Sequence, residues 1–207
     1  MSVAINNVTR TEPRREPLAL GVDDKRGTAG MWFFIMTEAA LFVMLFFSYF
    51  FVVVNGTRRS VEEPPKLHYA LPMLGILLLS SVVLYWGEQQ VKRQNDGFGR
   101  ILLAATIVIG LVFLVLQFFE YREHLKSLPP WTDTYGSIFY TITSFHAFHL
   151  IVGLLVLAYV LILPRFEPAQ RPPHRPYHNA ALYWHFVDLV WVFIVAILYV
   201  APNIWGI

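Results

Sequence analysis

Residues 101–121 read ILLAATIVIGLVFLVLQFFEY, an apolar run that carries very few polar side chains. An α-helix rises about 1.5 Å per residue, so about 20 apolar residues are enough to cross the hydrocarbon core of a bilayer. Strands of small soluble domains are much shorter than this run. We therefore expect residues 101–121 to form a transmembrane helix.

Four further apolar runs of similar length flank this one in the chain. Glycine and proline occur in the breaks between the runs, as at Asn55-Gly56 and Pro129-Pro130. No internal repeat or low-complexity tract divides the chain. The sequence predicts an all-α polytopic membrane helix bundle of five transmembrane helices, in a single domain over residues 31–207 that follows a polar tail over 1–30. The expected helices cover residues 31–54, 68–91, 101–121, 135–163 and 180–201.

The composition agrees with a membrane protein. Of the 207 residues, 56% are hydrophobic and 14% are charged, whereas soluble domains are nearer a quarter charged. The mean hydropathy is +0.51. The absence of cysteine excludes disulfides, thiolate zinc sites and iron–sulfur clusters. The net charge of +2 gives no indication of nucleic-acid binding.

Lysine and arginine are distributed unevenly between the two ends of the expected bundle. The N-terminal tail and the second and fourth connectors contain eleven of them, and the first and third connectors contain five. Because cytoplasmic segments carry the excess of positive charge, we expect the N-terminus inside and the C-terminus outside. The tail also lacks the apolar core of a cleaved signal peptide.

Ionisable side chains inside the apolar runs are candidate functional residues. A charged side chain near the bilayer centre costs about 2.5–3.5 kcal/mol, so it is retained with a partner or for a purpose. Glu38 and Asp188 are expected at similar depth, and His146 and His149 lie in the middle of the fourth run. We expect a buried carboxylate and a histidine to meet. Hydrogen-bonded packing is one interpretation of these residues, and proton handling by Glu38 is another.

A metal or haem site in this chain is not expected. Two histidine ligands of a haem come from opposite sides of its plane, whereas His146 and His149, three apart on one helix, point the same way. The runs 31–54, 68–91 and 101–121 contain no interior histidine that could complete such a site.

Residues near the expected helix ends are candidates for lipid or headgroup contact. Tryptophan prefers the headgroup region, and arginine and histidine can bind anionic headgroups. Glu88 and Glu120 are expected to reach headgroups or water. The predicted lipid or headgroup contacts are Trp32, Trp86, Glu120, Arg165, Arg171, His174, Arg175, Trp184 and His185.

Residues 183–191 read YWHFVDLVW, which resembles the last-helix pattern Trp-His-Phe-x-Asp-x-Val-Trp of subunit III of the haem-copper cytochrome c and quinol oxidases. Residues 145–149, FHAFH, are similar to the Phe-His-Gly-Leu-His of that family, with Ala147 in place of glycine. Other matching residues lie in order along the chain, at Trp32-Phe33-Phe34-Ile35, Glu38, Phe42, Ser80-Ser81-Val82, Trp86, Gln117, Glu120-Tyr121 and Tyr135-Gly136-Ser137. Departures lie at Glu88, Gln89 and His178.

The resemblance implies a non-redox accessory subunit in the bacterial cytoplasmic (inner) membrane, since five helices resemble the shorter bacterial form. Such a chain has no cofactor of its own and binds structural phospholipids in a V-shaped cleft. Its partners are the catalytic subunit I and subunit II, which carry the haem and copper that reduce oxygen and pump protons. The subunit supports proton uptake and protects the catalytic centre during turnover. Glu38 matches the reactive buried carboxylate of the family, and His149 and Asp188 match its polar interior.

Three alternatives stay open at this point. An accessory subunit of a nitric oxide reductase resembles subunit III over the same helices. A proton-coupled transporter could use Glu38, His149 and Asp188, although the sequence lacks the inverted repeat that many transporters contain. A membrane b-type cytochrome is opposed by the positions of the histidines. The sequence leaves the electron donor, cytochrome c or quinol, and the haem types of the partner open.

Overall fold

The computed structural model describes residues 24–54, 67–127, 134–162 and 174–202, and these residues form helices joined by one described turn. The helices are α1 (Asp24–Val54), α2 (Leu67–Lys92), α3 (Asp96–Ser127), α4 (Thr134–Ile162), α5 (His174–Ile194) and the π-helix η2 (Val195–Val200). Five spans in these helices are long and apolar enough to cross a membrane. The predicted all-α fold with five transmembrane helices is therefore confirmed, and the chain is a multi-pass membrane protein.

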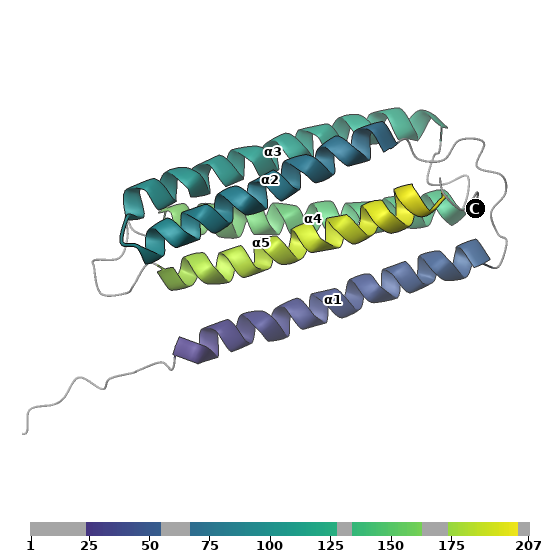
Figure 1. Cartoon of the computed structure of the whole chain (residues 1–207). Coiled ribbons are helices and arrows are strands. Elements are labelled where there is room, and N and C mark those ends of the chain that lie inside the picture. The colour runs from purple at the N-terminus through teal and green to yellow at the C-terminus, as the bar shows by residue number, and fades with distance from the viewer. Residues whose placement is uncertain (1–23, 55–66, 128–133, 163–173, 203–207) are drawn as a thin grey trace, which may run out of the picture.

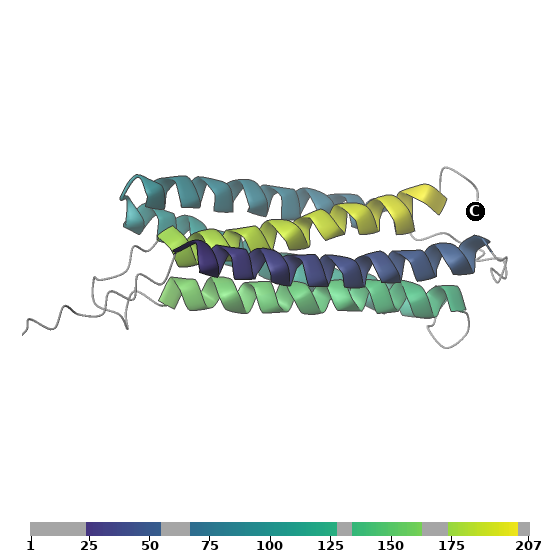
Figure 2. The same ribbon diagram turned by 90° about the horizontal axis from the view of Figure 1, so that it is seen from below.

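The helices run alternately up and down an elongated bundle, and η2 continues α5 (Figure 1). α2 packs along α3, while α5 contacts α1, α2 and α4. α1 contacts α4 and α5 and lies on the side of the bundle away from the α2–α3 pair (Figures 1 and 2). The start of α1 and the end of α5 lie at opposite ends of the bundle. Which end faces the cytoplasm stays a prediction.

Several helices extend beyond the apolar runs that predict them. α1 begins at Asp24, inside the segment expected to be a polar tail, and α3 extends from Asp96 to Ser127 rather than from 101 to 121. α5 begins at His174 rather than at residue 180. An apolar run marks the part of a helix that suits hydrocarbon, whereas backbone hydrogen bonds continue into polar residues at either end. Hydropathy therefore predicts the membrane span and not the helix ends.

A tight turn joins α2 to α3. The N–H of Asn95 donates to the carbonyl of Gln90 at 3.0 Å, and the N–H of Gln94 donates to that of Val91 at 3.0 Å. Gln94 has a φ of 62°. This pair of bonds with one left-handed residue is the Schellman motif that ends many helices. It reverses the chain within a few residues and lets α3 pack back along α2.

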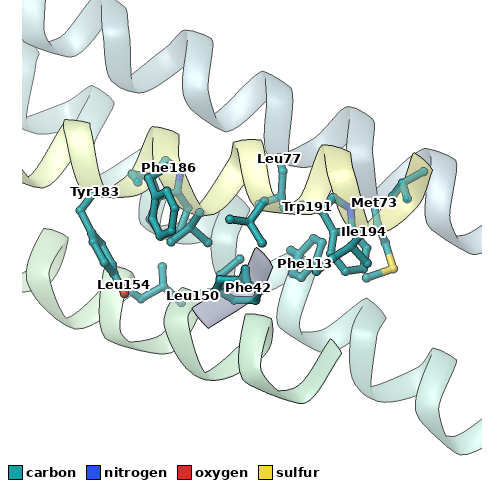
Figure 3. Packing of buried hydrophobic residues seen from close by; sticks show 14 of the residues in the cluster. Phe42, Met73, Leu77, Phe113, Leu150, Leu154, Tyr183, Phe186, Trp191 and Ile194 are labelled. Atoms are coloured by element: carbon teal, nitrogen blue, oxygen red, sulfur yellow. The ribbon is translucent and has the colours of Figure 1, made fainter. Parts of the chain in front are cut away.

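α5 is the most buried of the five spans, and α1 is the least buried. The fully buried aromatic side chains of α5 include Trp184 and Trp191. A Cβ at Gly110 of α3 would lie 2.7 Å from the Trp184 ring, and one at Gly153 of α4 would lie 3.0 Å from it. These two glycines therefore leave the space that the Trp184 indole fills. Further along α5, Trp191 packs edge-on against Phe113, with ring centroids 4.9 Å apart (Figure 3).

Candidate functional site

Glu38 of α1 and His149 of α4 form a pair between their helices. Nε2 of His149 lies 2.9 Å from Oε2 of Glu38, and Nδ1 lies 2.7 Å from the carbonyl oxygen of Phe145. A carbonyl can only accept, so Nδ1 carries a hydrogen. The contact between Nε2 and Oε2 then contains one further proton, which either group can hold. The structure thus brings together one carboxylate and one histidine of the candidate residues.

Packing holds this pair in place, while the Glu38 side chain stays partly exposed. The side chain of His149 is 8% exposed and that of Glu38 is 21% exposed. The ring of Phe42 lies 5.0 Å from the His149 ring in an edge-on contact, and the Tyr183 hydroxyl donates to the His149 carbonyl at 3.2 Å. Three helices, α1, α4 and α5, therefore hold the pair.

Asp188 lies in a separate contact between α5 and α2. The Ser81 hydroxyl donates to Oδ2 of Asp188, and Nδ1 of His185 lies 2.8 Å from the same Ser81 oxygen. Asp188 is 3% exposed. Asp188 and Glu38 are thus parts of different clusters, and the serine on α2 links the aspartate to His185.

His146 faces α3 and α5 rather than the Glu38 pair. It is fully buried, and its ring stacks on Trp191 with centroids 4.9 Å apart and an interplanar angle of 28°. Phe113 contacts the same ring edge-on at 6.0 Å. Although His146 and His149 lie on one helix, they pack against different neighbours. In the part of the chain that the structure describes, no three histidine, cysteine, aspartate or glutamate residues are grouped so that they could hold a metal ion.

The structure corrects the expected lipid or headgroup contacts of Trp184 and Glu120. Trp184 is 0% exposed, and its Nε1 donates to Ser80 Oγ at 2.9 Å. Glu120 is 1% exposed and accepts from the Tyr199 hydroxyl at 2.8 Å and from Nε2 of Gln117 at 3.0 Å. Both side chains lie between helices, so neither reaches lipid.

Glu88 is also buried, contrary to its expected solvated position. It is 5% exposed, and one carboxyl oxygen, Oε1, accepts from Lys92 Nζ at 2.7 Å and contacts Nδ1 of His178 at 2.8 Å. The Lys92 and His178 side chains are 46% and 40% exposed, so the cluster stays in contact with the surroundings of the chain. The first turns of α5 are thereby tied to the last turns of α2.

The remaining predicted lipid contacts stay predictions. Trp32 and Trp86 are 53% and 60% exposed, and His185 is half-buried. Arg165 and Arg171 lie outside the described residues, and His174 and Arg175 belong to the first turn of α5 without described side chains.

Two residues of these clusters went unrecognised as site residues in the sequence. Ser81 is a small polar residue in an apolar run, and small polar residues at helix–helix contacts are the signal that could have identified it. Tyr199 becomes a partner of Glu120 on the π-helix η2, and no sequence pattern predicts a π-helix at that position.

Known proteins are similar to this chain over most of its length. A family model described as cytochrome c oxidase subunit III matches residues 24–207. A cytochrome c oxidase subunit 3 of Synechocystis sp. is 34% identical over 174 residues, which cover 82% of this chain and 73% of that protein. Proteins of the same name from Prototheca wickerhamii and Drosophila yakuba are 32% and 30% identical, each over 86% of this chain and 68% of the relative. With its five helices, its YWHFVDLVW segment and these matches, the chain belongs to the cytochrome c oxidase subunit III family.

Proposed function

We propose that the chain is a non-redox accessory subunit of a terminal haem-copper oxidase, in which oxygen reduction is coupled to proton pumping. It stabilises the catalytic subunit, binds phospholipid and supports proton uptake. The observation that carries the proposal is the Glu38–His149 pair, at 2.9 Å, in a chain of the subunit III family. Haem and copper belong to the partner subunits I and II.

The pair has the chemistry of a proton-exchanging site. One proton lies between Oε2 of Glu38 and Nε2 of His149, while the Nδ1 hydrogen is committed to the Phe145 carbonyl. Because the Glu38 side chain is 21% exposed, the carboxyl group can exchange that proton with groups outside this chain. His149 holds the carboxyl group in place as it gains and loses the proton. This arrangement supports a role in proton supply to the partner.

The outer face of α1 suits lipid and a partner subunit. Phe33, Met44 and Phe47 are 71%, 68% and 68% exposed, and a bilayer or another membrane subunit would cover such side chains. Trp32 and Trp86 are exposed near helix ends, where headgroups would lie. We place the subunit in a bacterial cytoplasmic membrane with its N-terminus inside, as the distribution of lysine and arginine predicts.

The names of the relatives favour an oxidase over a nitric oxide reductase, since those reported above are cytochrome c oxidase subunits. An independent proton-coupled transporter is less well supported. Glu38 and Asp188, which such a transporter would use together, lie in separate clusters with different partners.

Substitution of Glu38 tests the proposal. We expect Glu38→Ala to leave the oxidase assembled but to shorten the time over which it turns over before inactivation, with Glu38→Gln behaving similarly because an amide cannot lose a proton at neutral pH. Ser48→Ala is the matched control, since Ser48 is exposed on the same helix and bonds its own backbone at Met44. Progress curves of oxygen consumption measure the effect. Loss of the assembled complex in Glu38→Ala would show that Glu38 is mainly structural, and unchanged curves would contradict a proton role.

A further inference from the structure

Three neighbouring polar groups inside the bundle have no hydrogen-bond partner among the described residues. They are Oδ1 of Asp188, Nε1 of Trp191 and the two ring nitrogens of His146. Asp188 is 3% exposed, and the other two residues are 0% exposed. A buried polar atom without a partner costs about 1–3 kcal/mol, so native proteins rarely leave several together.

The three residues lie on two helices that pack against each other. Asp188 and Trp191 are three residues apart on α5 and therefore lie on the same face of the helix. The His146 ring stacks on the Trp191 ring at 4.9 Å from the facing side, on α4. The cluster is thus formed by two helices, and the edge-on ring of Phe113 on α3 borders it.

The chemistry of these atoms matches a small ligand that both donates and accepts. The indole Nε1 can only donate, and a carboxylate oxygen can only accept. A neutral imidazole offers one donor and one acceptor. A molecule that bridges Trp191 and an ionised Asp188 accepts from the indole N–H and donates to the carboxylate, and close packing of fully buried side chains favours the smallest such ligand. Water has this capacity, and buried waters typically make about three hydrogen bonds to groups of this kind.

We propose that Asp188, Trp191 and His146 form a binding site for ordered water between α4 and α5. The water accepts from Nε1 of Trp191, donates to Oδ1 of Asp188 and completes its bonding with a ring nitrogen of His146. Since the other oxygen of Asp188 accepts from Ser81, which also contacts His185, the water extends a hydrogen-bonded chain from α2 through α5 to α4. Neither the subunit III assignment nor the Glu38 pair is needed for this inference.

Trp184 is a matched internal control on the same helix. Trp184 and Trp191 are both 0% exposed, but Nε1 of Trp184 donates directly to Ser80 Oγ at 2.9 Å. Burial alone would therefore isolate both indole N–H groups from water. Only the proposed site would give Trp191 a contact with water that Trp184 lacks.

Water-edited solid-state NMR of the full chain in lipid bilayers, labelled with ¹⁵N-tryptophan, tests the proposal. The Trp191 indole signal is assigned by its loss in Trp191→Phe. Valine carbonyl labelling identifies the Trp191 backbone amide, since Val190-Trp191 is the one Val-Trp pair in the sequence, and correlation of that amide with its own side chain assigns the indole independently. We expect magnetisation to pass from water to the Trp191 indole several-fold faster than to that of Trp184. Equal and slow transfer to both indoles would overturn the proposal.

His146→Phe provides a second reading in the same experiment. Phenylalanine keeps a ring stacked on Trp191 but removes both nitrogens, so the water loses one of its partners. We expect the transfer rate to Trp191 to fall several-fold while that to Trp184 stays unchanged. An unchanged rate at Trp191 would show that the water reaches the indole without His146 and would contradict the three-residue site.

Discussion

Glu38 and His149 share a single proton across the contact between α1 and α4, because Nδ1 of His149 donates to the Phe145 carbonyl and Nε2 lies 2.9 Å from the carboxyl oxygen. The proposed proton role of Glu38 would therefore depend on His149. We expect His149→Gln to shorten oxidase turnover life as Glu38→Ala does, and the double variant to be no worse than either single one. Oxygen-consumption progress curves check this. Leu155→Ala, at a residue of the same helix that is 65% exposed, is the control, and additive losses would contradict the coupling.

Gly110 is required for the close packing of α3 on Trp184. A Cβ there would lie 2.7 Å from the Trp184 ring and 2.8 Å from Leu154. We expect Gly110→Ala to destabilise the bundle by about 1–3 kcal/mol, as overpacking of a core commonly does. Unfolding of the detergent-purified chain in sodium dodecyl sulfate, followed by circular dichroism, measures the loss. Gly75→Ala is the control, since a Cβ at Gly75 meets nothing within 4 Å. Equal stability of the two variants would refute the packing argument.

Ser81 stabilises the α2–α5 contact through Asp188 and His185. Ser81→Ala removes the hydroxyl that donates to Oδ2 of Asp188 and leaves that buried oxygen without this partner. We expect a loss of about 1–3 kcal/mol in the same unfolding experiment. Ser48→Ala removes an exposed hydroxyl and should change the stability by less than about 0.5 kcal/mol. A loss no greater than that of Ser48→Ala would show that Asp188 finds another donor.

Tyr199 on η2 supplies one of the two donors to the buried Glu120. Tyr199→Phe leaves Oε1 of Glu120 without that bond and should destabilise the chain by about 1–3 kcal/mol. Tyr159→Phe, at a residue that is 64% exposed, should be nearly neutral. The comparison uses the same denaturant titration, and identical transitions would mean that Glu120 gains nothing from Tyr199.

Gln94 adopts the left-handed conformation that glycine adopts without cost. Its φ is 62°, and a side chain in this region costs about 1–2 kcal/mol. We expect Gln94→Gly to raise the free energy of unfolding by about 1 kcal/mol. Asn95→Gly, one residue later, should bring no gain, because Gln94 is the described non-glycine residue with positive φ. Loss of stability in Gln94→Gly would mean that the glutamine side chain has a role of its own.

The five spans could be predicted from the sequence because each apolar run had to match the thickness of a bilayer. The Glu38–His149 contact was also expected in kind, since an acid and a histidine in hydrocarbon need partners. Spacing along a single helix could not show which residue of another helix each of these polar side chains contacts. Asp188, for example, meets Ser81 of α2, a contact that its spacing along α5 did not indicate.

The wrongly predicted surroundings of three residues have one physical source. Glu88, Glu120 and Trp184 lie near the ends of the apolar runs, where a single helix would expose them to headgroups or water. Tertiary packing buries them instead, through His178 beside Glu88, Tyr199 beside Glu120, and Gly110 with Gly153 around Trp184. Position along one helix predicts depth in the membrane, whereas burial depends on the neighbouring helices.

The most direct test of the proposed function is purification in mild detergent through a tag on the N-terminal tail, with an optical spectrum and mass spectrometry of the proteins that co-purify. We predict that a large haem- and copper-binding oxidase subunit accompanies the chain and that its haem bands appear in the spectrum. The haem type and the accompanying subunits would also identify the electron donor. A solitary protein without haem would contradict the role of an oxidase subunit and would favour an independent transporter.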